Sequence, residues 1–254
     1  MSAFALSTKE LSLSFGAFHA VSAVNINVAA GQRHALIGPN GAGKTSLINL
    51  LTGIYKPTSG QVLLEGENIT QLAFNERVQH GLARTFQLNT LCLSLTPFDV
   101  VMMALSERER LGHVWWKPLY AYEALRVEAQ ELLLQVGLAS HGNAVTGELA
   151  YGKQRLLEIA LALALKPKVL LLDEPTAGIP EGESDAVFEL IAQLPAQLSV
   201  IFIEHDMDLV FNFAQRISVL VSGRVLVEGC PQEIIEHPLV RDAYLGADFY
   251  AKNT

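Results

Sequence analysis

Three glycines, a lysine and a threonine lie close together at residues 38–45. The stretch reads Gly38-Pro39-Asn40-Gly41-Ala42-Gly43-Lys44-Thr45 and fits the pattern G-x-x-x-x-G-K-[ST] completely. Glycines let backbone N–H groups turn inward around phosphate oxygens without a Cβ in the way. A helix that begins near Lys44 would direct the positive end of its dipole at the same oxygens. We expect Lys44 to place a charge on the β- and γ-phosphates of a nucleotide, and Thr45 to offer Mg²⁺ a hydroxyl ligand, with Ser46 beside it.

Two neighbouring carboxylates supply the second part of this chemistry. The apolar run Val169–Leu172 reads as a buried strand and is followed directly by Asp173 and Glu174. By itself, this pattern fits equally well a strand that ends in solvated charges. Together with the loop at 38–45, it places two acids at the sheet edge where ligands of parallel α/β proteins bind. We expect Asp173 to hold Mg²⁺ through water, and Glu174 to polarise the water that attacks the γ-phosphorus.

The elements that must position these residues indicate an α/β fold. Alternating runs at 11–15 and 24–28 predict half-buried strands, and Ala35–Ile37 predicts the short strand that leads into the glycine-rich loop. Helical periodicity dominates from about residue 73 to 165, and short apolar strands return from Val169 onward. Runs that are apolar on both faces favour a parallel sheet covered by helices. We therefore predict one domain over 1–254, with a core at about 1–86 and 166–254 and a helical subdomain at about 87–165.

Composition and charge narrow the class of protein. The chain has 254 residues, a net charge of −8 and two cysteines, Cys92 and Cys230, without metal-type spacing. Its mean hydropathy of +0.28 is high, but charged residues and Pro167 interrupt the most apolar stretch, 156–172, so no membrane span is predicted. The N-terminus has no signal-peptide pattern. The acidic balance argues against a nucleic acid as the main partner.

Further motifs make the sequence similar to the ABC ATPase family over nearly the whole chain. The stretch Leu149-Ala-Tyr-Gly-Lys-Gln154 resembles the signature motif of that family, usually written LSGGQ. Gln87 stands at the position of the Q-loop glutamine, His205 at that of the switch histidine, and 177–180 at that of the D-loop. The resemblance implies a P-loop NTPase (RecA-like) core with an antiparallel β subdomain and an inserted α-helical subdomain.

The resemblance also implies roles for single residues. Phe15 would stack on adenine, although an ordinary strand core residue fits the same position. Gln87 would contact Mg²⁺ or the attacking water, and would link the nucleotide to a partner bound on the helical insertion. His205 would bind the γ-phosphate, with a structural histidine as the alternative. Ala150, Tyr151 and Gly152 would face the ATP of a second ATPase subunit, so that each ATP lies between two chains in a homo- or heterodimer.

Two positions depart from the family pattern. Ala150 replaces the usual signature serine, which removes one hydroxyl from the γ-phosphate. A hydrogen bond to a charged group contributes about 1.5–3 kcal/mol, so we expect binding across the dimer to weaken and not to vanish. Pro180 with Glu181 is unlike the commoner D-loop, which affects the expected contacts between the two subunits.

Within the family, the chain looks most like the ATPases of branched-chain amino acid importers. The shared features are the sequences at 84–87, 149–152, 203–207 and 243–246. The resemblance implies two membrane-spanning permease subunits, a separate solute-binding protein, and a peripheral position on the cytoplasmic face of the inner membrane. Related importers carry amides, urea or other small solutes. An export or lipid-extraction ATPase, and a soluble ABC ATPase outside transport, remain as alternatives.

One aromatic pair has no role in this scheme. Trp115 and Trp116 lie in the predicted helical insertion. They fit either a groove that receives a permease helix or packing inside the subdomain, and the sequence does not distinguish these two readings.

Overall fold

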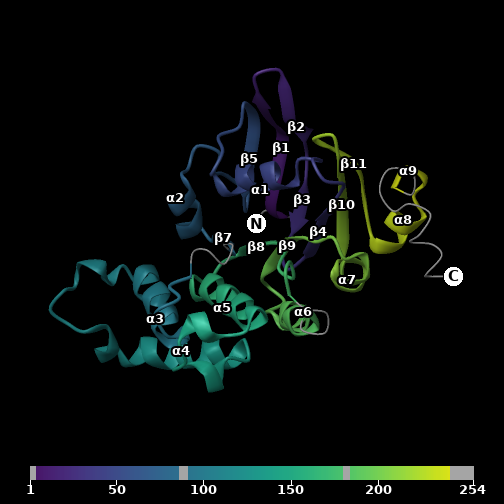
Figure 1. Cartoon of the computed structure of the whole chain (residues 1–254). Coiled ribbons are helices and arrows are strands. Elements are labelled where there is room, and N and C mark those ends of the chain that lie inside the picture. Colours follow the sequence, from purple (N-terminus) through teal and green to yellow (C-terminus); the bar gives the residue numbers. More distant parts are fainter. Residues whose placement is uncertain (1–3, 86–90, 180–183, 241–254) are drawn as a thin grey trace. The chain divides into compact units, whose positions relative to one another are not determined.

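The computed structural model describes residues 4–85, 91–179 and 184–240, and these residues form two compact units (Figure 1). The first unit holds the described parts of Met1–Leu82, Lys168–Glu174 and Pro195–Thr254, and the second those of Ala83–Pro167 and Pro175–Leu194. The second unit differs from the helical subdomain predicted at about 87–165 because it also includes Pro175–Leu194. The reason is that helix α6 (Ser184–Gln193) packs against helix α5 (Tyr151–Ala164).

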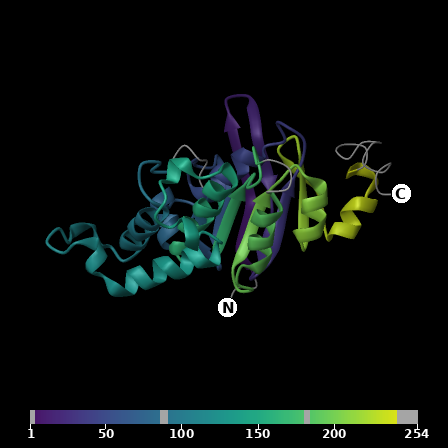
Figure 2. The same ribbon diagram turned by 60° about the horizontal axis from the view of Figure 1, so that its bottom comes forward.

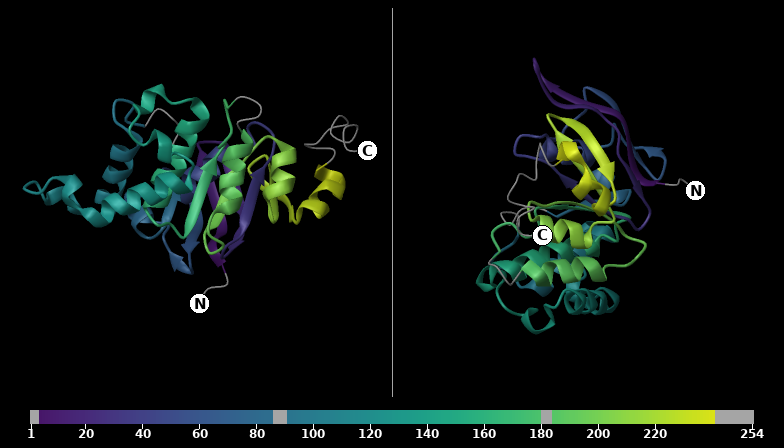
Figure 3. Two further views of the ribbon diagram at one scale, coloured as in Figure 1. Left: turned by 90° about the horizontal axis from the view of Figure 1, so that it is seen from below. Right: turned by 90° about the vertical axis from the view of Figure 1, so that its right-hand side faces the viewer.

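A six-stranded sheet forms the centre of the first unit. Its strand order is β11-β10-β4-β9-β8-β7, and the neighbours β10, β4, β9 and β8 are parallel. In Figure 3 these strands lie side by side. The strands β8 and β9 are buried along nearly their whole length, which explains their uninterrupted apolar sequences. The bounds are β4 Arg33–Ile37, β7 Leu82–Arg84, β8 Val169–Asp173, β9 Ser199–Ile203, β10 Arg216–Val221 and β11 Arg224–Gly229.

An antiparallel sheet of five strands forms the other layer of this unit. Its order is β2-β1-β5-β6, and β3 also pairs with β1. The prediction of a single strand over 24–28 was wrong: β2 ends at Val24 and β3 begins at Asn27, because β1 changes partner there and its register shifts. The bounds are β1 Phe4–Phe15, β2 Phe18–Val24, β3 Asn27–Ala29, β5 Ser59–Leu64 and β6 Glu67–Asn68.

Helix α1 (Lys44–Thr52) contributes to the hydrophobic core that joins both sheets. Its buried side chains include Leu47, Ile48, Leu50 and Leu51, which belong to one cluster with residues of β1, β5, β8 and β9. The described part of this unit also contains the helices α2 Phe74–Gln79, α7 Met207–Phe213, α8 Pro231–Glu236 and α9 Pro238–Val240. Burial of the apolar face of α1 fixes the helix against the sheet from which the phosphate-binding loop emerges.

The C-terminal end of α1 is capped by a buried arginine from α2. The side chain of Arg77 is 1% exposed. Its guanidinium donates to the carbonyl oxygens of Leu50 at 2.7 Å and Leu51 at 2.6 Å, and also to those of Thr70 and Leu72. Burial lowers the pKa of Arg77 to about 10, so the group is charged at neutral pH. A cation at this end interacts favourably with the helix dipole, and its N–H groups satisfy carbonyls that have no partner within the helix.

Among the described residues, the second unit contains four α-helices. Helices α3 (Pro97–Arg108), α4 (Glu123–Gln135) and α5 contact one another in pairs, as Figure 2 shows, and α6 packs on α5. In the part of the chain that the structure describes, their connections include short 3-10 helices at Leu111–His113, Leu119–Ala121, Ala139–His141 and Thr146–Glu148. No helix in the described part of the chain is long and apolar enough to cross a membrane.

Trp115 and Trp116 lie in the connection between α3 and α4 and do not pack inside the unit. The exposed fraction is 87% for Trp115 and 68% for Trp116. The structure therefore contradicts the reading in which the two tryptophans pack inside the subdomain, and places their side chains on the surface.

A bidentate ion pair joins α3 to α4. Arg108 donates to both carboxylate oxygens of Glu128, at 2.6 and 2.7 Å, and Lys166 lies 3.0 Å from the same carboxylate. The hydrogen bonds from Arg108 are the largest cause that lowers the pKa of Glu128 from 4.5 to about 2. Paired hydrogen bonds of this kind fix geometry as well as charge.

We predict that Glu128→Gln destabilises the protein in a pH-dependent way. The folded pKa lies below the ordinary value, so the stabilisation is present above about pH 4.5 and is lost as pH falls toward 2. With allowance for screening by solvent, the free energy of unfolding at pH 7 should fall by about 1–2 kcal/mol. Denaturant unfolding followed by circular dichroism at pH 7, and again at about pH 3, should show the difference shrinking.

The exposed pair of Glu123 with Arg126 provides the control, because it has the same helix and the same charges at 2.9 Å. Glu123→Gln should change stability by less than about 0.5 kcal/mol. A Glu128→Gln effect that stays constant down to low pH would contradict the electrostatic explanation.

Candidate nucleotide site

The loop between β4 and α1 has the backbone conformation that its glycines predict. Gly38, Gly41 and Gly43 have φ angles of 149°, 80° and 100°, a region that L side chains rarely adopt. Gly43 is the residue directly before α1, so the loop passes straight into the helix N-terminus. Free backbone N–H groups at this end make it suited to bind an anion.

Neighbouring backbone holds this loop from two sides. A Cβ at Gly38 would collide with the carbonyl oxygen of Leu220, and a Cβ at Gly43 with that of Ala20. The N–H of Gly223 donates to the carbonyl of Ala42 at 2.9 Å. Glycine is therefore required at 38 and 43 for two reasons, the left-handed backbone and the close approach of other strands.

Lys44 is buried beside the two predicted acids. The residue is 7% exposed, and its Nζ donates to the carbonyl oxygens of Gly38 at 2.7 Å and Pro39 at 3.1 Å. Burial lowers the pKa of Lys44, while the charges of Glu174 and Asp173 act in the opposite direction. The ammonium group is thus held at the mouth of the loop, where it can exchange carbonyl partners for phosphate oxygens.

The two acids end strand β8, as the sequence predicts. Asp173 is the last residue of β8. Glu174 follows with a φ of 48°, unusual for a residue other than glycine, and its N–H donates to the carbonyl of Ile203 at 3.0 Å. This conformation costs about 1–2 kcal/mol, and such outliers concentrate at functional sites. The turn brings the Glu174 carboxylate to His205.

His205 and Glu174 form a hydrogen-bonded pair. Nε2 of His205 lies 2.8 Å from Oε1 of Glu174, and both side chains are partly exposed. The N–H of His205 donates to its buried neighbour Glu204 at 3.1 Å, and Asp206 caps helix α7 by accepting from the N–H of Leu209. The end of β9 and the start of α7 therefore fix the position of the histidine.

One cavity brings most of the predicted residues together. It has a volume of about 250 Å³ and lies entirely within the first unit. Its walls come from the phosphate-binding loop, the ends of β8 and β9, and strand β2. The lining residues are Phe18, Ala20, Asn40, Gly41, Ala42, Gly43, Lys44, Thr45, Ser46, Glu174 and His205.

The aromatic side chain in the cavity wall is Phe18, which the sequence analysis missed. Phe15 lies at the end of β1 and contacts Tyr55 edge to face, with ring centroids 5.7 Å apart. Phe15 and Phe18 are paired in the β1–β2 hairpin, so the turn at Gly16 places one of them in the cavity. An exposed aromatic directly after a hairpin turn is the signal that could have identified Phe18.

The segment that resembles the signature motif lies in the second unit, at the start of α5. Ala150 is the residue before the helix, and its side chain cannot cap the first N–H groups. Tyr151 is exposed and Gly152 is buried. Gln154 folds back and donates from Nε2 to the carbonyl of Leu149 at 2.8 Å. A helix of fourteen residues thus begins with unsatisfied N–H groups at the predicted contact for a second ATP.

Comparison with known proteins decides the family. The model of the ABC transporter family matches residues 21–177, and that of the branched-chain amino acid ATP-binding cassette transporter matches residues 224–250. The chain is 38% identical over 250 residues to the high-affinity branched-chain amino acid transport ATP-binding protein BraF of Pseudomonas aeruginosa, covering 95% of this chain and 97% of that protein. The chain belongs to the branched-chain amino acid family of ABC transporter ATP-binding proteins.

Solved structures agree with this assignment. An ATP-binding cassette of an ABC transporter in its ADP conformation has a TM-score of 0.84 and 30% identity, covering 95% of this chain and 98% of that one. A dimeric cassette in a post-hydrolysis state, bound to ADP and Pi, has a TM-score of 0.73 and 25% identity, covering 89% and 98%. The P-loop NTPase fold with its mixed α/β core is confirmed.

This ABC ATPase binds ATP and couples its hydrolysis to transport. The residues predicted for the reaction divide between the two units. Loop residues 40–46 meet Glu174 and His205 in the cavity of the first unit, whereas Ala150, Tyr151 and Gly152 belong to the second. Gln87, Pro180, Glu181 and the sequence at 243–246 lie outside the described residues.

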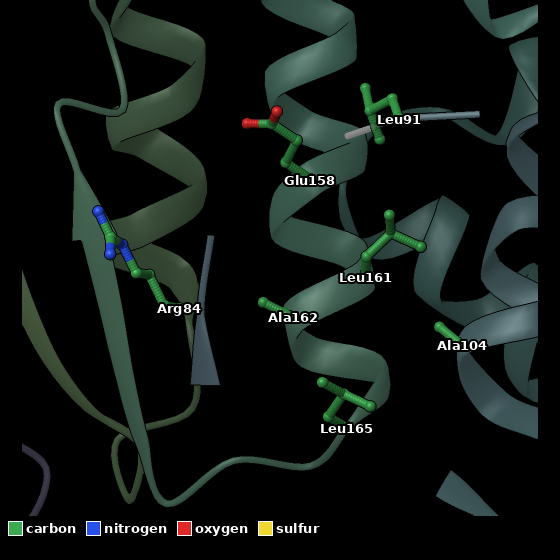
Figure 4. A pocket seen from close by; sticks show the side chains of 7 residues that line it. All are labelled: Arg84, Leu91, Ala104, Glu158, Leu161, Ala162 and Leu165. Atoms are coloured by element: carbon green, nitrogen blue, oxygen red, sulfur yellow. The ribbon is translucent and has the colours of Figure 1, made fainter. Parts of the chain in front are cut away.

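A second cavity of the ABC ATPase lies within its helical unit (Figure 4). Its volume is about 320 Å³ and its lining is mainly apolar. Glu158 in its wall forms a buried pair with Arg155 at 2.7 Å, and burial raises the pKa of Glu158. One carboxylate oxygen of Glu158 has no hydrogen-bond partner among the described residues. The lining residues are Arg84, Leu91, Ala104, Glu158, Leu161, Ala162 and Leu165.

We predict that Gly43→Ala and Gly41→Ala have different effects, although both glycines have positive φ. Gly41 has open space around it, so Gly41→Ala should cost only the left-handed backbone, about 1–2 kcal/mol. Gly43→Ala should cost at least about 1–3 kcal/mol more, because the methyl group meets the carbonyl of Ala20. Denaturant unfolding without nucleotide measures both. Equal losses would show that the backbone around Gly43 yields easily.

Proposed function

We propose that this cassette powers an importer of branched-chain amino acids or of related small polar solutes such as amides and urea. BraF, whose name assigns it to high-affinity branched-chain amino acid transport, matches the chain over nearly its whole length. The match at residues 224–250 belongs to the same transporter class. The observation that supports the ATPase chemistry is the single cavity in which Lys44, Thr45, Glu174 and His205 meet.

The phosphate-binding loop performs the binding step. Its backbone N–H groups and the N-terminus of α1 face the phosphates, and Lys44 adds a full positive charge. The carbonyl oxygens of Gly38 and Pro39 now hold the ammonium group, so a phosphate oxygen competes for a donor that is already oriented. Phe18 offers an aromatic face in the same cavity, and Phe15 remains the candidate that the family resemblance assigns to adenine.

Mg²⁺ would be held by Thr45, Asp173 and Gln87. The described residues contain no cluster of three or more His, Cys, Asp or Glu side chains. Mg²⁺ commonly binds through one or two carboxylates of a protein and takes further ligands from phosphates and water. Thr45 lines the cavity, and Asp173 acts electrostatically on Lys44 from the end of β8. When bound, Mg²⁺ would neutralise charge that develops on the phosphates.

Glu174 is the proposed general base for hydrolysis of ATP to ADP and phosphate. Its carboxylate accepts a proton from the attacking water as the new O–P bond forms and the bond to ADP breaks. His205, 2.8 Å from Oε1, orients this carboxylate and can donate to an oxygen of the γ-phosphate. The backbone turn at Glu174 positions its carboxylate, while the phosphate-binding loop and the N-terminus of α1 hold the phosphates.

The signature segment would complete the site of a second copy or a related ATPase subunit. The N-terminus of α5, with Ala150, Tyr151 and Gly152, offers free N–H groups to an anion. The similarity to a cassette solved as a dimer supports this arrangement. Backbone groups must carry the contact, since Ala150 has no hydroxyl.

Two membrane-spanning permeases are the proposed partners, together with a separate solute-binding protein. The permeases would hold the cassette at the cytoplasmic face of the inner membrane.

The cavity of the helical unit is the candidate contact for a permease. Its apolar lining and the unsatisfied oxygen of Glu158 suit an apolar segment that carries one hydrogen-bond donor.

We predict that Glu174→Gln lowers steady-state ATP hydrolysis by about 10²–10⁴-fold, the usual contribution of a general base. The amide keeps the shape of the side chain but cannot accept the proton, so ATP should still bind. Size-exclusion chromatography with ATP and Mg²⁺ should then show an accumulated dimer. Glu236→Gln changes an exposed residue of α8; it serves as the control and should hydrolyse ATP normally. Undiminished turnover by Glu174→Gln would remove Glu174 from the role of base.

Affinity purification of the tagged chain from detergent-solubilised native membranes tests the transport assignment. We expect two polytopic permeases to co-elute, identified by mass spectrometry, and their associated binding protein should bind a branched-chain amino acid or a small amide. Co-elution of export or lipid-extraction components would instead indicate an export or lipid-extraction ATPase. Co-elution of ribosomal or DNA-repair proteins would indicate a soluble ABC ATPase outside transport, and would leave the ATPase chemistry unchanged.

A further inference from the structure

The connection between α3 and α4 exposes an unusual set of aromatic side chains. Trp115 is the most exposed large hydrophobic residue in the described part of the chain, and Trp116 and Tyr120 are exposed as well. The two indole rings are 6.1 Å apart and stand at 85° to each other, so they present different faces to solvent. We call Arg110–Tyr122 the aromatic loop.

The aromatic loop is fastened at its base although its tip is exposed. Tyr120 stacks on Phe98 with ring centroids 6.1 Å apart, and its hydroxyl donates to the carboxylate of Asp99. Asp99 also closes the capping box of α3 with Thr96. The start of α3 therefore holds the loop in a defined position, and the exposure of the tryptophans is a feature of that position.

The charge of the loop is opposite to that of the chain. Arg110, His113 and Lys117 lie between residues 110 and 122, where no acidic residue occurs, although the whole chain has a net charge of −8. The ammonium group of Lys117 lies 4.0 Å above the ring of Tyr122. Glu109 and Glu123, which flank the loop, are each paired with an arginine at 2.9 Å. Their negative charge is thus offset locally.

We propose that the aromatic loop binds the headgroup region of a bilayer that contains anionic lipids. Tryptophan and tyrosine prefer this region because they combine an apolar ring with a polar atom. Arginine and lysine bury their stems and keep their charges at the level of the lipid phosphates. The net charge of −8 of the whole chain opposes contact with the same surface, whereas the charge of this loop favours it.

A protein groove fits these features less well. The centre of a protein interface is depleted of charged residues, and its aromatic anchors fill pockets in the partner. Here Lys117 directly follows Trp116 at the tip, and the two indoles diverge. A soft interface accommodates such a convex, charged surface. The proposal is independent of the transported solute, and of the chemistry assigned to Glu174.

Trp115 and Trp116 are the only tryptophans of the chain, so intrinsic tryptophan fluorescence reports on the aromatic loop alone. The purified full-length chain is titrated with vesicles of phosphatidylcholine, with and without phosphatidylglycerol. We expect the emission to shift to the blue, and quenching by aqueous iodide to fall, with the anionic vesicles at low salt. Higher salt should weaken both effects.

Variants test the loop directly by co-sedimentation with the same vesicles. Lys117→Glu keeps both tryptophans and should bind anionic vesicles at least about fivefold more weakly, as expected for the loss of one basic residue near the surface. The double variant Trp115→Ala/Trp116→Ala should sediment less than the wild type. Leu134→Ala removes a side chain that is also 68% exposed, on α4 outside the loop, and should bind normally. Circular dichroism verifies the fold of each variant.

Several results would overturn the proposal. One is unchanged emission of the wild type with anionic vesicles. Another is equal sedimentation of the double tryptophan variant. A blue shift that occurs only in the detergent-purified complex with the permeases would assign the loop to a protein contact, against a lipid one. None of these outcomes depends on ATP hydrolysis, so a failure here is distinguishable from a failure of the proposed function.

Discussion

The close approach of two carbonyl oxygens to the phosphate-binding loop is the constraint on which the nucleotide site depends. The carbonyl of Leu220, in the six-stranded sheet, and that of Ala20, in the antiparallel sheet, occupy the space that a Cβ would need at Gly38 and Gly43. The loop is therefore clamped between the two sheets of the first unit. Its left-handed backbone turns N–H groups inward, and α1 starts in a fixed direction. Lys44, the first residue of α1, takes its position from this clamp.

Buried charge is balanced at both ends of α1. At the N-terminus, Lys44 lies near Asp173 and Glu174, and these acids oppose the lowering of its pKa by burial. At the C-terminus, Arg77 satisfies the carbonyls of Leu50 and Leu51. The helix dipole favours the arginine at its end and an anion at its start. The fold thus holds a cation ready for phosphate, while the helix that presents it stays anchored.

The helical unit follows a different physical logic. The Arg108–Glu128 pair holds α3 and α4 together through charge-assisted hydrogen bonds with little exposure. Around this scaffold, the unit presents the N-terminus of α5, an apolar cavity and the aromatic loop. These three features are the candidate sites at which the unit contacts other molecules. The cavity that contains Lys44, Glu174 and His205, by contrast, lies in the first unit.

The sequence by itself determined the ATPase chemistry, because the motifs that carry this chemistry are local patterns. The phosphate-binding loop, the acids after a buried strand and the histidine after the next strand each need only a few consecutive residues, and the α/β fold followed from their alternation. Tertiary structure decided what depends on residues distant in the chain. It placed Phe18 in the cavity wall, split the strand predicted at 24–28, and joined Glu174 to His205 across 31 positions. It also left Trp115 and Trp116 in solvent. The physical reason is that exposure and pairing are set by which strands and helices become neighbours, and one-dimensional periodicity does not encode those neighbours.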